Sequence, residues 1–505
     1  MICIGLFGLI TAKIIIHESA GFFDSVTIFE KEAEIGGVWR AGQIYPGLAS
    51  NSPARTYEIP GFKYPEAQRK TGSHVSAESI NAYLKSFSRT YGLEHHISFE
   101  TLVSSIFWDR KTSLWTLSLQ QGPKTFNKSF KFLVICNGMY HEPNLPGIVS
   151  ISDSFTGKMF HSRNVGAHSV REQLSGSLHN LVVGAGKSAL DLATALARQA
   201  WAESKSKCPH VTLLYRKPHW LSPRVIIRSS VFFERVMFSR FVNAWLPFSE
   251  HPDRFHRWSA QSSLGKICTH AIFALIEDDF IKGCGQQDLP LTVPDYPIKQ
   301  ALSGALHVEP LGYLNLVRDG KITILQGELR SMKGSTVTIR TRSNEQKQLK
   351  VDSIVWATGY TLGPFRNIAF NGFAYSLLNP TVAYVSAHWI ADYFSGNLYI
   401  PSSSVVQKGK LKNWTTLPPR ALTTIRYRSI LCLAEKYFWC PWSKRYTHWL
   451  TCHTIRRSTY SGHGASHRTC SWIKVQSYTL CKRMVQANVS TDIFYATCGE
   501  NGSKF

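Results

Sequence analysis

The sequence of 505 residues predicts an α/β protein with two parallel-sheet domains, one inserted into the other. Two glycine-containing turns carry this prediction: C-I-G-L-F-G at residues 3–8 and G-A-G-K-S-A at residues 184–189. Each turn leads from an apolar segment into a helical pattern, which is the order of strand, turn and helix in Rossmann-like dinucleotide-binding domains. The chain is also longer than one compact core normally allows, so we expect two or more domains.

The first turn keeps Gly5 and Gly8 of a G-x-G-x-x-G pattern, but Cys3 replaces the first glycine and the strand before it is almost absent. A short β-rich run at residues 26–30 follows and ends in Glu30. An acid at the end of the second strand accepts hydrogen bonds from ribose hydroxyl groups. We therefore expect Glu30 to bind the ribose of a dinucleotide, with an ordinary surface acid as the alternative.

The second turn has the expected neighbours on both sides. An apolar strand at residues 180–183 precedes it, and an amphipathic helix at residues 190–199 follows it. Backbone N–H groups at the start of such a helix bind pyrophosphate. We therefore expect a nucleotide to be held by Gly184, Gly186 and Ser188.

The strand after this helix, residues 211–215, ends in Arg216 and Lys217 and not in an acid. A basic pair at this position suits the 2′-phosphate of NADPH, whereas NADH would favour a carboxylate. We therefore expect both residues to select NADPH. A basic pair exposed at a strand end is the alternative.

The segment E-K-E-A-E-I-G-G-V-W-R at residues 30–40, with F-T-G-K-M-F-H at residues 155–161, resembles the flavin-containing monooxygenases, the N,N-dimethylaniline monooxygenase-like enzymes. The resemblance covers roughly residues 1–415 and implies FAD and NADPH as cofactors. In the first domain it implies contacts to the cofactor from Gly37, Val38, Trp39, Ser50 and Asn51. At the later strand end A-T-G-Y it implies further contacts from Thr358 and Gly359.

The resemblance gives particular roles to Asn51 and His161. The asparagine matching Asn51 lies by the reactive edge of the flavin and helps to hold the C4a-hydroperoxyflavin, whereas composition alone would make it a turn residue. His161 closes the family fingerprint with Phe155 and Gly157, and we expect it to order the connection between the domains and not to act as a general base. The fingerprint normally ends in an aromatic residue where this chain has Val165, which counts against a Baeyer–Villiger enzyme.

The resemblance therefore implies an enzyme in which NADPH reduces FAD and one oxygen atom of O2 is inserted into a small molecule at nitrogen or sulfur. A tailoring role in secondary metabolism is a further hypothesis. Three alternatives stay open: a Baeyer–Villiger monooxygenase acting on ketones, an NADPH-dependent disulfide reductase, and an inactive flavoprotein remnant. The reductase would need a C-x-x-C or similar redox pair, and the sequence has no C-x-x-C.

We expect the chain to pass from the first domain into the second and back again. The expected ranges are 1–165 for the first part of the FAD-binding domain, 166–345 for the NADPH-binding domain with a helical insertion at about 220–330, 346–419 for the return to the FAD-binding domain, and 420–505 for an atypical basic tail. The tail is poor in acids, and we interpret it as a segment outside the native fold. A basic docking tail is the alternative.

The formal net charge of +24 is concentrated after residue 400, so we do not expect the folded part to bind nucleic acid. The eleven cysteines lack metal-ligand spacing, which predicts no metal site. No apolar run reaches the roughly 20 residues of a transmembrane helix, since Lys13 interrupts the apolar start. We expect a cytoplasmic protein whose partners are its substrate and O2, and the sequence does not indicate an oligomeric state.

Overall fold

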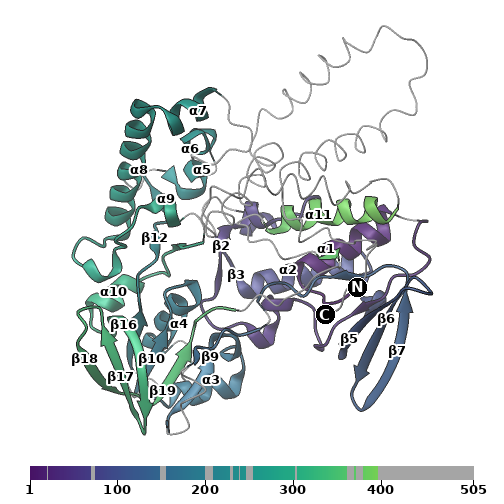
Figure 1. Ribbon diagram of the computed structural model, residues 1–505, viewed down its shortest axis with the longest axis horizontal. Coiled ribbons are helices and arrows are strands. Elements are labelled where there is room, and N and C mark those ends of the chain that lie inside the picture. Colours follow the sequence, from purple (N-terminus) through teal and green to yellow (C-terminus); the bar gives the residue numbers. More distant parts are fainter. Residues whose placement is uncertain are drawn as a thin grey trace.

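The computed structural model describes residues 1–19, 21–69, 74–140, 142–147, 155–199, 209–227, 231–237, 239–245, 254–301, 304–360, 369–370 and 379–395. The basic tail expected at 420–505 lies outside the described residues. Figure 1 shows two bodies of sheet and helix side by side, and a helical body adjoining the second.

The first domain is built on a parallel sheet of short strands. β1 (Ile28–Phe29) pairs with β4 (Ile97–Ser98), and β8 (Val134–Ile135) pairs with β20 (Ala369–Phe370). The helices against this sheet are α1 (Leu6–Lys13), α2 (Ala77–Thr90) and α11 (Asn379–Phe394), whose apolar side chains share one core. An antiparallel sheet of β5 (Thr101–Asp109), β6 (Leu114–Gln121) and β7 (Lys124–Phe130) projects from the domain (Figure 1).

Ile2 occupies the centre of the first sheet. It forms parallel bridges to Phe29 on one side and to Ile135 on the other. Backbone hydrogen bonds of 2.8–3.0 Å join residues 1–3 and their neighbours to both strands. The strand that we expected to be almost absent is therefore short but in place, and it delivers the chain directly into the first glycine turn.

The second domain has a sheet of seven strands in the order β18-β17-β16-β11-β10-β19-β9. Its strands are β9 (Lys158–His161), β10 (His179–Val183), β11 (His210–Tyr215), β16 (Ile322–Lys333), β17 (Thr336–Thr341), β18 (Gln346–Lys350) and β19 (Ser353–Trp356). The five strands from β16 to β9 are parallel, and β16, β17 and β18 form an antiparallel meander. Its helices are α3 (His168–Ser175), α4 (Lys187–Ala197) and α10 (Tyr313–Arg318). Parallel strands joined through helices make this an α/β domain.

Two strands belong to a different domain from the one expected from the sequence. β9 lies within the range 1–165 expected for the first domain, and β19 lies within the range 346–419 expected for the return to it. Both belong to the second sheet, because His161 pairs with Trp356 and the whole of β19 pairs with β10. The chain therefore enters the second domain before β9 and returns to the first sheet only at β20.

The segment expected as a helical insertion, 220–330, is helical only in its middle part. Its helices are α5 (Phe233–Met237), α6 (Arg240–Trp245), α7 (Arg254–Gln261), α8 (Ser263–Cys284) and α9 (Ile298–Ala301). Short strand pairs flank them: β12 (Trp220–Ser222) with β15 (Leu306–Val308), and β13 (Val225–Ile226) with β14 (Val231–Phe232). The end of the expected range is wrong, because β16 begins at Ile322 and pairs in parallel with β11.

None of the helices in the described ranges has both the length and the apolar character needed to cross a membrane. Within the same part of the chain, no group of three or more His, Cys, Asp or Glu side chains is placed to hold a metal ion.

Candidate functional site

The first glycine turn, residues 3–8, has a backbone shape that favours glycine. Cys3 has a φ of +70°, in the left-handed region that glycine adopts most readily. A Cβ on Gly8 would lie 2.2 Å from the carbonyl oxygen of Cys3, so only glycine fits at that position. A Cβ on Gly37 would lie 2.9 Å from the Cα of Gly5, because two loops touch there by their backbones. The cysteine therefore adopts the conformation that a first glycine would have.

Glu30 fastens this turn from the end of β1. Its carboxylate accepts hydrogen bonds from the N–H of Ile4 at 2.8 Å and of Glu32 at 3.0 Å. The residue is 4% exposed, and burial raises the pKa of its carboxyl group. This excludes an ordinary surface acid, while the ribose contact expected of Glu30 stays a prediction.

The turn Gly37–Trp39 has one anchored and one accessible side chain. The indole N–H of Trp39 donates to the hydroxyl of Tyr57 at 2.8 Å, and the side-chain amide of Asn81 donates to the Trp39 carbonyl at 2.7 Å. Val38 is 40% exposed. Trp39 therefore holds the loop in place, and Val38 is the side chain that a bound molecule can reach.

Ser50 lies in β2 (Ala49–Pro53), which pairs with β3 (His74–Ser76). Its hydroxyl donates to the carbonyl of Ser52 and accepts from the N–H of Val75 at 3.2 Å. These bonds use the hydroxyl within the strand pair. The Ser50 carbonyl is also used, since it bonds to the Nδ1 of His74 at 2.9 Å. The cofactor contact expected of Ser50 stays a prediction.

Asn51 and Asn137 share an unusual feature. The side-chain Oδ1 of each is buried and has no hydrogen-bond partner among the described residues. A buried acceptor without a donor is unfavourable unless a ligand supplies the donor. Asn51 follows the Ser50 position in β2, and Asn137 follows β8, so both extend from the first domain. Either oxygen is therefore a candidate acceptor for an N–H group of a bound ligand, such as the one on the flavin ring.

The second glycine turn connects β10 to α4. Gly184 has a φ of +145°, and a Cβ there would lie 2.3 Å from the carbonyl oxygen of Ala357 in the strand alongside. Gly186 precedes α4 with no side chain capping the helix, and a Cβ on it would meet nothing within 4 Å. The first N–H groups of α4 are thus not capped by a side chain, as an anion-binding helix start requires.

Ser188 forms a hydrogen bond with the hydroxyl of Tyr45, a residue of the first domain. Tyr45 is 5% exposed and packs within the core of the second domain, where burial raises its pKa well above the ordinary value. The backbone beside it is equally close, since a Cβ on Gly166 would lie 2.3 Å from the carbonyl carbon of Gln43. Tyr45 therefore joins the two domains next to the second turn.

His161 stands at the carboxyl end of β9, close to the residues after β19. Its Nε2 donates to the carbonyl of Gly359 at 3.0 Å, and its Nδ1 accepts from the N–H of Arg163 at 3.2 Å. Burial lowers the pKa of His161, which favours this neutral form. Thr358 donates its hydroxyl to the carbonyl of Asn144, so that side chain is also used within the protein.

Phe155 and Gly157 lie at the opposite end of β9 from His161. Phe155 bridges to Gly334 and packs in the apolar layer against β17 and β19. A Cβ on Gly157 would lie 2.4 Å from the Phe155 ring and 2.8 Å from the carbonyl oxygen of Asp352. The three fingerprint residues therefore lie at two different places. Only His161 reaches the edge of the sheet where the second glycine turn lies.

Arg216 and Lys217 follow β11, as expected, and both are exposed. The ammonium group of Lys217 lies 3.5 Å from the carboxylate of Asp295, which also accepts from Arg342 at 2.8 Å. Arg216 is therefore the better placed of the two for a nucleotide phosphate, because Lys217 already has an anionic neighbour.

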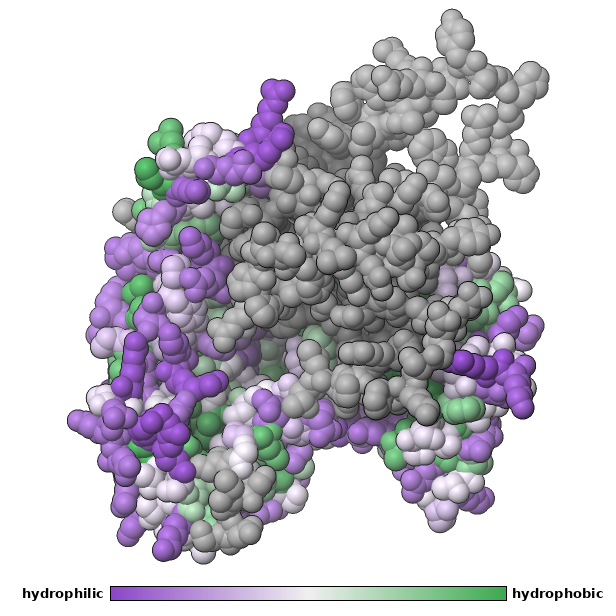
Figure 2. All heavy atoms as spheres, in the orientation of Figure 1, coloured by the Kyte–Doolittle hydropathy of each residue, from purple (hydrophilic) through white to green (hydrophobic). Residues whose placement is uncertain are grey.

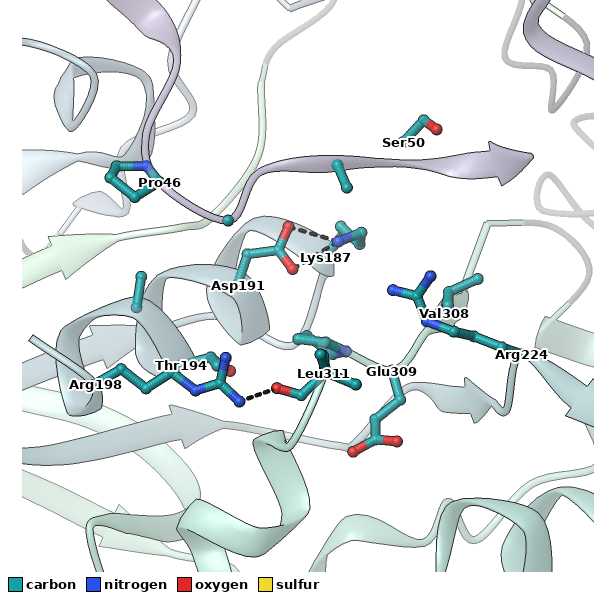
Figure 3. Close-up of a pocket in the computed structure, with 14 residues that line it drawn as sticks. Pro46, Ser50, Lys187, Asp191, Thr194, Arg198, Arg224, Val308, Glu309 and Leu311 are labelled. Carbon is teal, nitrogen blue, oxygen red and sulfur yellow. Dashed lines mark hydrogen bonds and ion pairs between the residues drawn. The ribbon is translucent and has the colours of Figure 1, made fainter. Parts of the chain in front are cut away.

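A pocket of about 300 Å³ lies between the two domains. The first domain contributes the segment before and in β2, and the second contributes one face of α4 and the residues after β12 and β15 (Figure 3). Lys187 contacts both carboxylate oxygens of Asp191 at 2.6 Å, and Arg198 donates to the carbonyl of Leu311. The wall of the pocket is thus rich in fixed charges.

Arg224 is a residue of this pocket that the sequence analysis did not identify. Figure 3 shows its guanidinium group directed toward the same space as Lys187, with the carboxylate of Glu309 pointing elsewhere. Burial lowers the pKa of Arg224, although nearby Glu309 and Asp191 oppose the effect. A half-buried cation facing a pocket suits an anionic ligand. No spacing rule singles out an arginine that follows so short a strand.

Comparison with known proteins identifies the family. A profile of FMO-like, flavin-binding monooxygenase-like proteins matches residues 1–310, which is more than half of the chain. The chain therefore belongs to the flavin-binding monooxygenase-like family, and the resemblance in its sequence is confirmed.

Three relatives illustrate the range of similarity. The FAD-containing monooxygenase EthA of Mycobacterium tuberculosis is 26% identical over 360 residues, covering 68% of this chain and 65% of that protein. A Baeyer-Villiger monooxygenase of Streptomyces coelicolor is 29% identical over 39% of this chain and 34% of its own length. The FAD-binding monooxygenase tazF of Aspergillus terreus is 29% identical over 44% of this chain and 37% of its own length. The chain thus spans between about a third and two thirds of these relatives.

Solved structures show the same fold at low identity. Cyclohexanone monooxygenase with bound epsilon-caprolactone has a TM-score of 0.57 at 15% identity, covering 86% of this chain and 96% of that one. Steroid monooxygenase bound to NADP has a TM-score of 0.52 at 17% identity, covering 78% and 84%. These likenesses confirm the predicted α/β fold.

Proposed function

We propose that this chain is an FAD- and NADPH-dependent monooxygenase that inserts one oxygen atom of O2 into a small molecule at nitrogen or sulfur. The observation that carries the proposal is the pocket between the domains. Its wall combines Ser50, the neighbour of Asn51 in the first domain, with Lys187, the first residue of the helix after the second glycine turn. One space is therefore bounded by β2 of the first domain and by the start of the helix that follows the second glycine turn, and transfer between two cofactors requires such a shared space.

In this proposal the first domain holds FAD. The turn at residues 3–8 receives the pyrophosphate, Glu30 accepts from the ribose, and the unpartnered oxygens of Asn51 and Asn137 accept from the flavin ring. Bound FAD would supply the redox chemistry, taking a hydride from NADPH and passing electrons to O2. Asn51 keeps a neutral amide beside the ring and helps to exclude water from it.

NADPH is held by the second domain. The uncapped start of α4 binds its pyrophosphate, and Arg224 adds positive charge from the far wall of the pocket. Arg216 selects the 2′-phosphate. His161, Thr358 and Gly359 form the connection beneath this site through the hydrogen bond between His161 and Gly359, and none of them needs to transfer a proton.

Oxygen insertion into ketones is the second candidate, favoured by the relative named as a Baeyer-Villiger monooxygenase. Val165 argues against it: the side chain is fully buried in the second-domain core, and no aromatic ring occupies its place. A disulfide reductase has less support, because burial raises the pKa of the Cys3 thiol, next to the first turn, to about 12. A tailoring role in secondary metabolism would be supported if the substrate proved to be a secondary metabolite.

The test uses the purified full chain. We expect the visible absorption spectrum of bound flavin, NADPH oxidation in the presence of O2, and an oxygenated product from an amine or a thioether. A lactone or ester from a ketone alone would establish the second candidate. Absence of flavin, after reconstitution with FAD, would indicate an inactive remnant and refute the proposal.

A further inference from the structure

Arg40 is an arginine that the protein largely encloses beside the first glycine turn. Figure 2 shows hydrophilic side chains over much of the described surface, so an exposed arginine would be ordinary there. The side chain of Arg40 is only 17% exposed, and its Nε is buried without a hydrogen-bond partner among the described residues. A buried N–H group is unfavourable unless an acceptor is supplied, and a bound anion supplies one.

The loop that ends in Arg40 lies against the turn proposed to receive the FAD pyrophosphate. Gly37 and Gly5 touch by their backbones, since a Cβ on Gly37 would lie 2.9 Å from the Cα of Gly5. The N–H of Gly36 also donates to the carbonyl of Ile4 at 3.3 Å. Arg40 follows Gly37 by three residues. It therefore belongs to the nucleotide site of the first domain.

The guanidinium group of Arg40 has two edges with different surroundings. Its Nη1 pairs with the carboxylate of Glu32. The Nε–H lies on the other edge with an N–H of Nη2, and this pair of parallel donors matches two oxygens of one phosphate group. The side chain of Glu32 is 33% exposed, so water solvates it if the guanidinium turns toward a ligand. The pairing with Glu32 therefore does not prevent Arg40 from binding an anion.

Arg163 brings a second cation to the same place from the second domain. A Cβ on Gly166 would lie 2.3 Å from the carbonyl carbon of Gln43, so the segments 40–43 and 163–166 are in backbone contact. Burial lowers the pKa of Arg40, and the positive charge of Arg163 lowers it further, so the two side chains are near each other. Like charges held close together repel each other, and an anion between them removes the repulsion.

We propose that Arg40 and Arg163 together bind the pyrophosphate of FAD, so that the second domain supplies one of the groups that hold the cofactor of the first. This inference rests on the proposed function, in which the first domain holds FAD. Each guanidinium donates charge-assisted hydrogen bonds to phosphate oxygens, and the negative charge of the pyrophosphate offsets the repulsion between the two arginines. Bound FAD then holds the segment 163–166 against the segment 40–43.

NADPH carries the same pyrophosphate group and is the other source of this ligand chemistry. The contact of Gly37 with Gly5 favours FAD, because it places the loop of Arg40 on the first turn. The negative charge of Glu30 also reaches Arg40, where it opposes the lowering of the pKa by burial. Glu30 is the acid proposed to bind the ribose of FAD, so Arg40 lies in the neighbourhood of the same nucleotide.

The first experiment titrates the full chain, freed of flavin, with FAD and follows the quenching of flavin fluorescence. We expect the dissociation constant of FAD to rise about tenfold or more in R40A and in R163A, since each loses charge-assisted hydrogen bonds. R163A keeps the backbone N–H that donates to His161. R40K keeps the charge without the paired donors and should recover part of the affinity lost in R40A. The matched control is K85A, whose FAD affinity should be unchanged, because Lys85 pairs with Glu34 of the same loop at 3.0 Å.

The second experiment separates a contact to the pyrophosphate from an effect on the shape of the loop. At saturating FAD, R40A and R163A should keep the visible spectrum of the bound flavin and the KM for NADPH, because the ribityl chain separates the pyrophosphate from the flavin ring. An altered flavin spectrum would assign Arg40 to shaping the loop. A raised KM for NADPH with unchanged FAD binding would assign the arginines to NADPH. Either outcome overturns the proposal.

Failure of this inference differs from failure of the proposed function. Circular dichroism confirms that each variant is folded. An unmodified chain that binds no FAD refutes the proposed function together with this inference. An unmodified chain that binds FAD no more tightly than R40A and R163A refutes only the role of the two arginines.

Discussion

His161 donates from its Nε2 to the carbonyl oxygen of Gly359 at 3.0 Å, and this bond ties the end of β9 to the loop that follows β19. The other ring nitrogen accepts from the N–H of Arg163 at 3.2 Å. A protonated ring would direct an N–H at that same backbone N–H group. The neutral histidine therefore connects two strand ends, and it holds the loop that contains Thr358 and Gly359, for which the family resemblance implies cofactor contacts.

Buried histidines make the stability of the fold depend on pH. Burial, assisted by nearby positive charge, lowers the pKa of His74 to about 4 and that of His307 to about 3. Above the ordinary histidine pKa of 6.5, both histidines are neutral in the folded and the unfolded chain, and the free energy of unfolding keeps its full value. As the pH falls toward 4, the unfolded chain takes up protons that the folded chain does not, so the free energy of unfolding decreases. Relative to neutral pH, each histidine should lower the free energy of unfolding by about 1 kcal/mol at about pH 5.5.

Urea unfolding at both pH values measures this loss. H74Q should remove the share of His74 and so reduce the difference between the two free energies of unfolding. A free energy of unfolding that is constant across this range in the unmodified chain would contradict the assignment.

Cys3 occupies a glycine position at a φ of +70°. Replacing it by glycine should relieve backbone strain of about 1 kcal/mol or more. We expect C3G to raise the melting temperature and to retain FAD at least as well as the unmodified chain. C3S is the matched control, since it keeps a Cβ and therefore keeps the strain. Equal melting temperatures for C3G and C3S would show that the turn is relaxed with cysteine.

Arg216 is the residue proposed to select NADPH. Loss of one charge-assisted phosphate contact weakens binding by roughly ten- to a hundredfold. R216A should therefore raise the KM for NADPH by that factor and leave the KM for NADH nearly unchanged. K217A should have a smaller effect, because Asp295 already neighbours its ammonium group.

Two further variants show whether the effect of R216A on the KM for NADPH is specific to the 2′-phosphate. R224A should weaken both nucleotides, since Arg224 faces the pocket and not the end of β11. R330A removes an exposed arginine paired with Glu328 and should change neither KM. Equal use of NADPH and NADH by the unmodified enzyme would refute the role of Arg216.

Asn51 is expected to couple flavin oxidation to product formation. N51A should be reduced by NADPH at the normal rate but should release hydrogen peroxide in place of oxygenated product, because the amide beside the flavin is lost. Stopped-flow reduction and peroxide yield measure the two steps separately. S50A is the matched control: its hydroxyl bonds within the strand pair, so it should lower stability by about 1 kcal/mol and leave coupling unchanged. If N51A couples flavin oxidation to product formation as well as the unmodified enzyme does, Asn51 has only a structural role.

The fold class and both glycine turns could be predicted because their signals are local. A strand, a turn and a helix follow one another within about twenty residues, and the close approach of Gly8 to Cys3 or of Gly184 to Ala357 admits only glycine. The domain limits could not be predicted in the same way. β9 and β19 lie far apart in the sequence, and only their pairing, Ser353 with Lys158, shows that both belong to the second sheet.

The candidate site shows the same division between local and distant signals. The sequence placed Glu30 and Ser188 near the turns but gave no sign that they bond to Ile4 and to Tyr45. Arg224 was missed because its significance depends on the pocket around it, whose wall comes from both domains.

Tyr45 connects the two domains in a way that restricts how they can move. Its ring is buried in the core of the second domain while its chain belongs to the first, and Gln43 beside it touches the backbone of Gly166. A rotation of one domain against the other that displaced this ring would have to break the packing of the second-domain core. The contact at Ser188 is thus as costly to open as a piece of the hydrophobic core, although it joins two separate sheets.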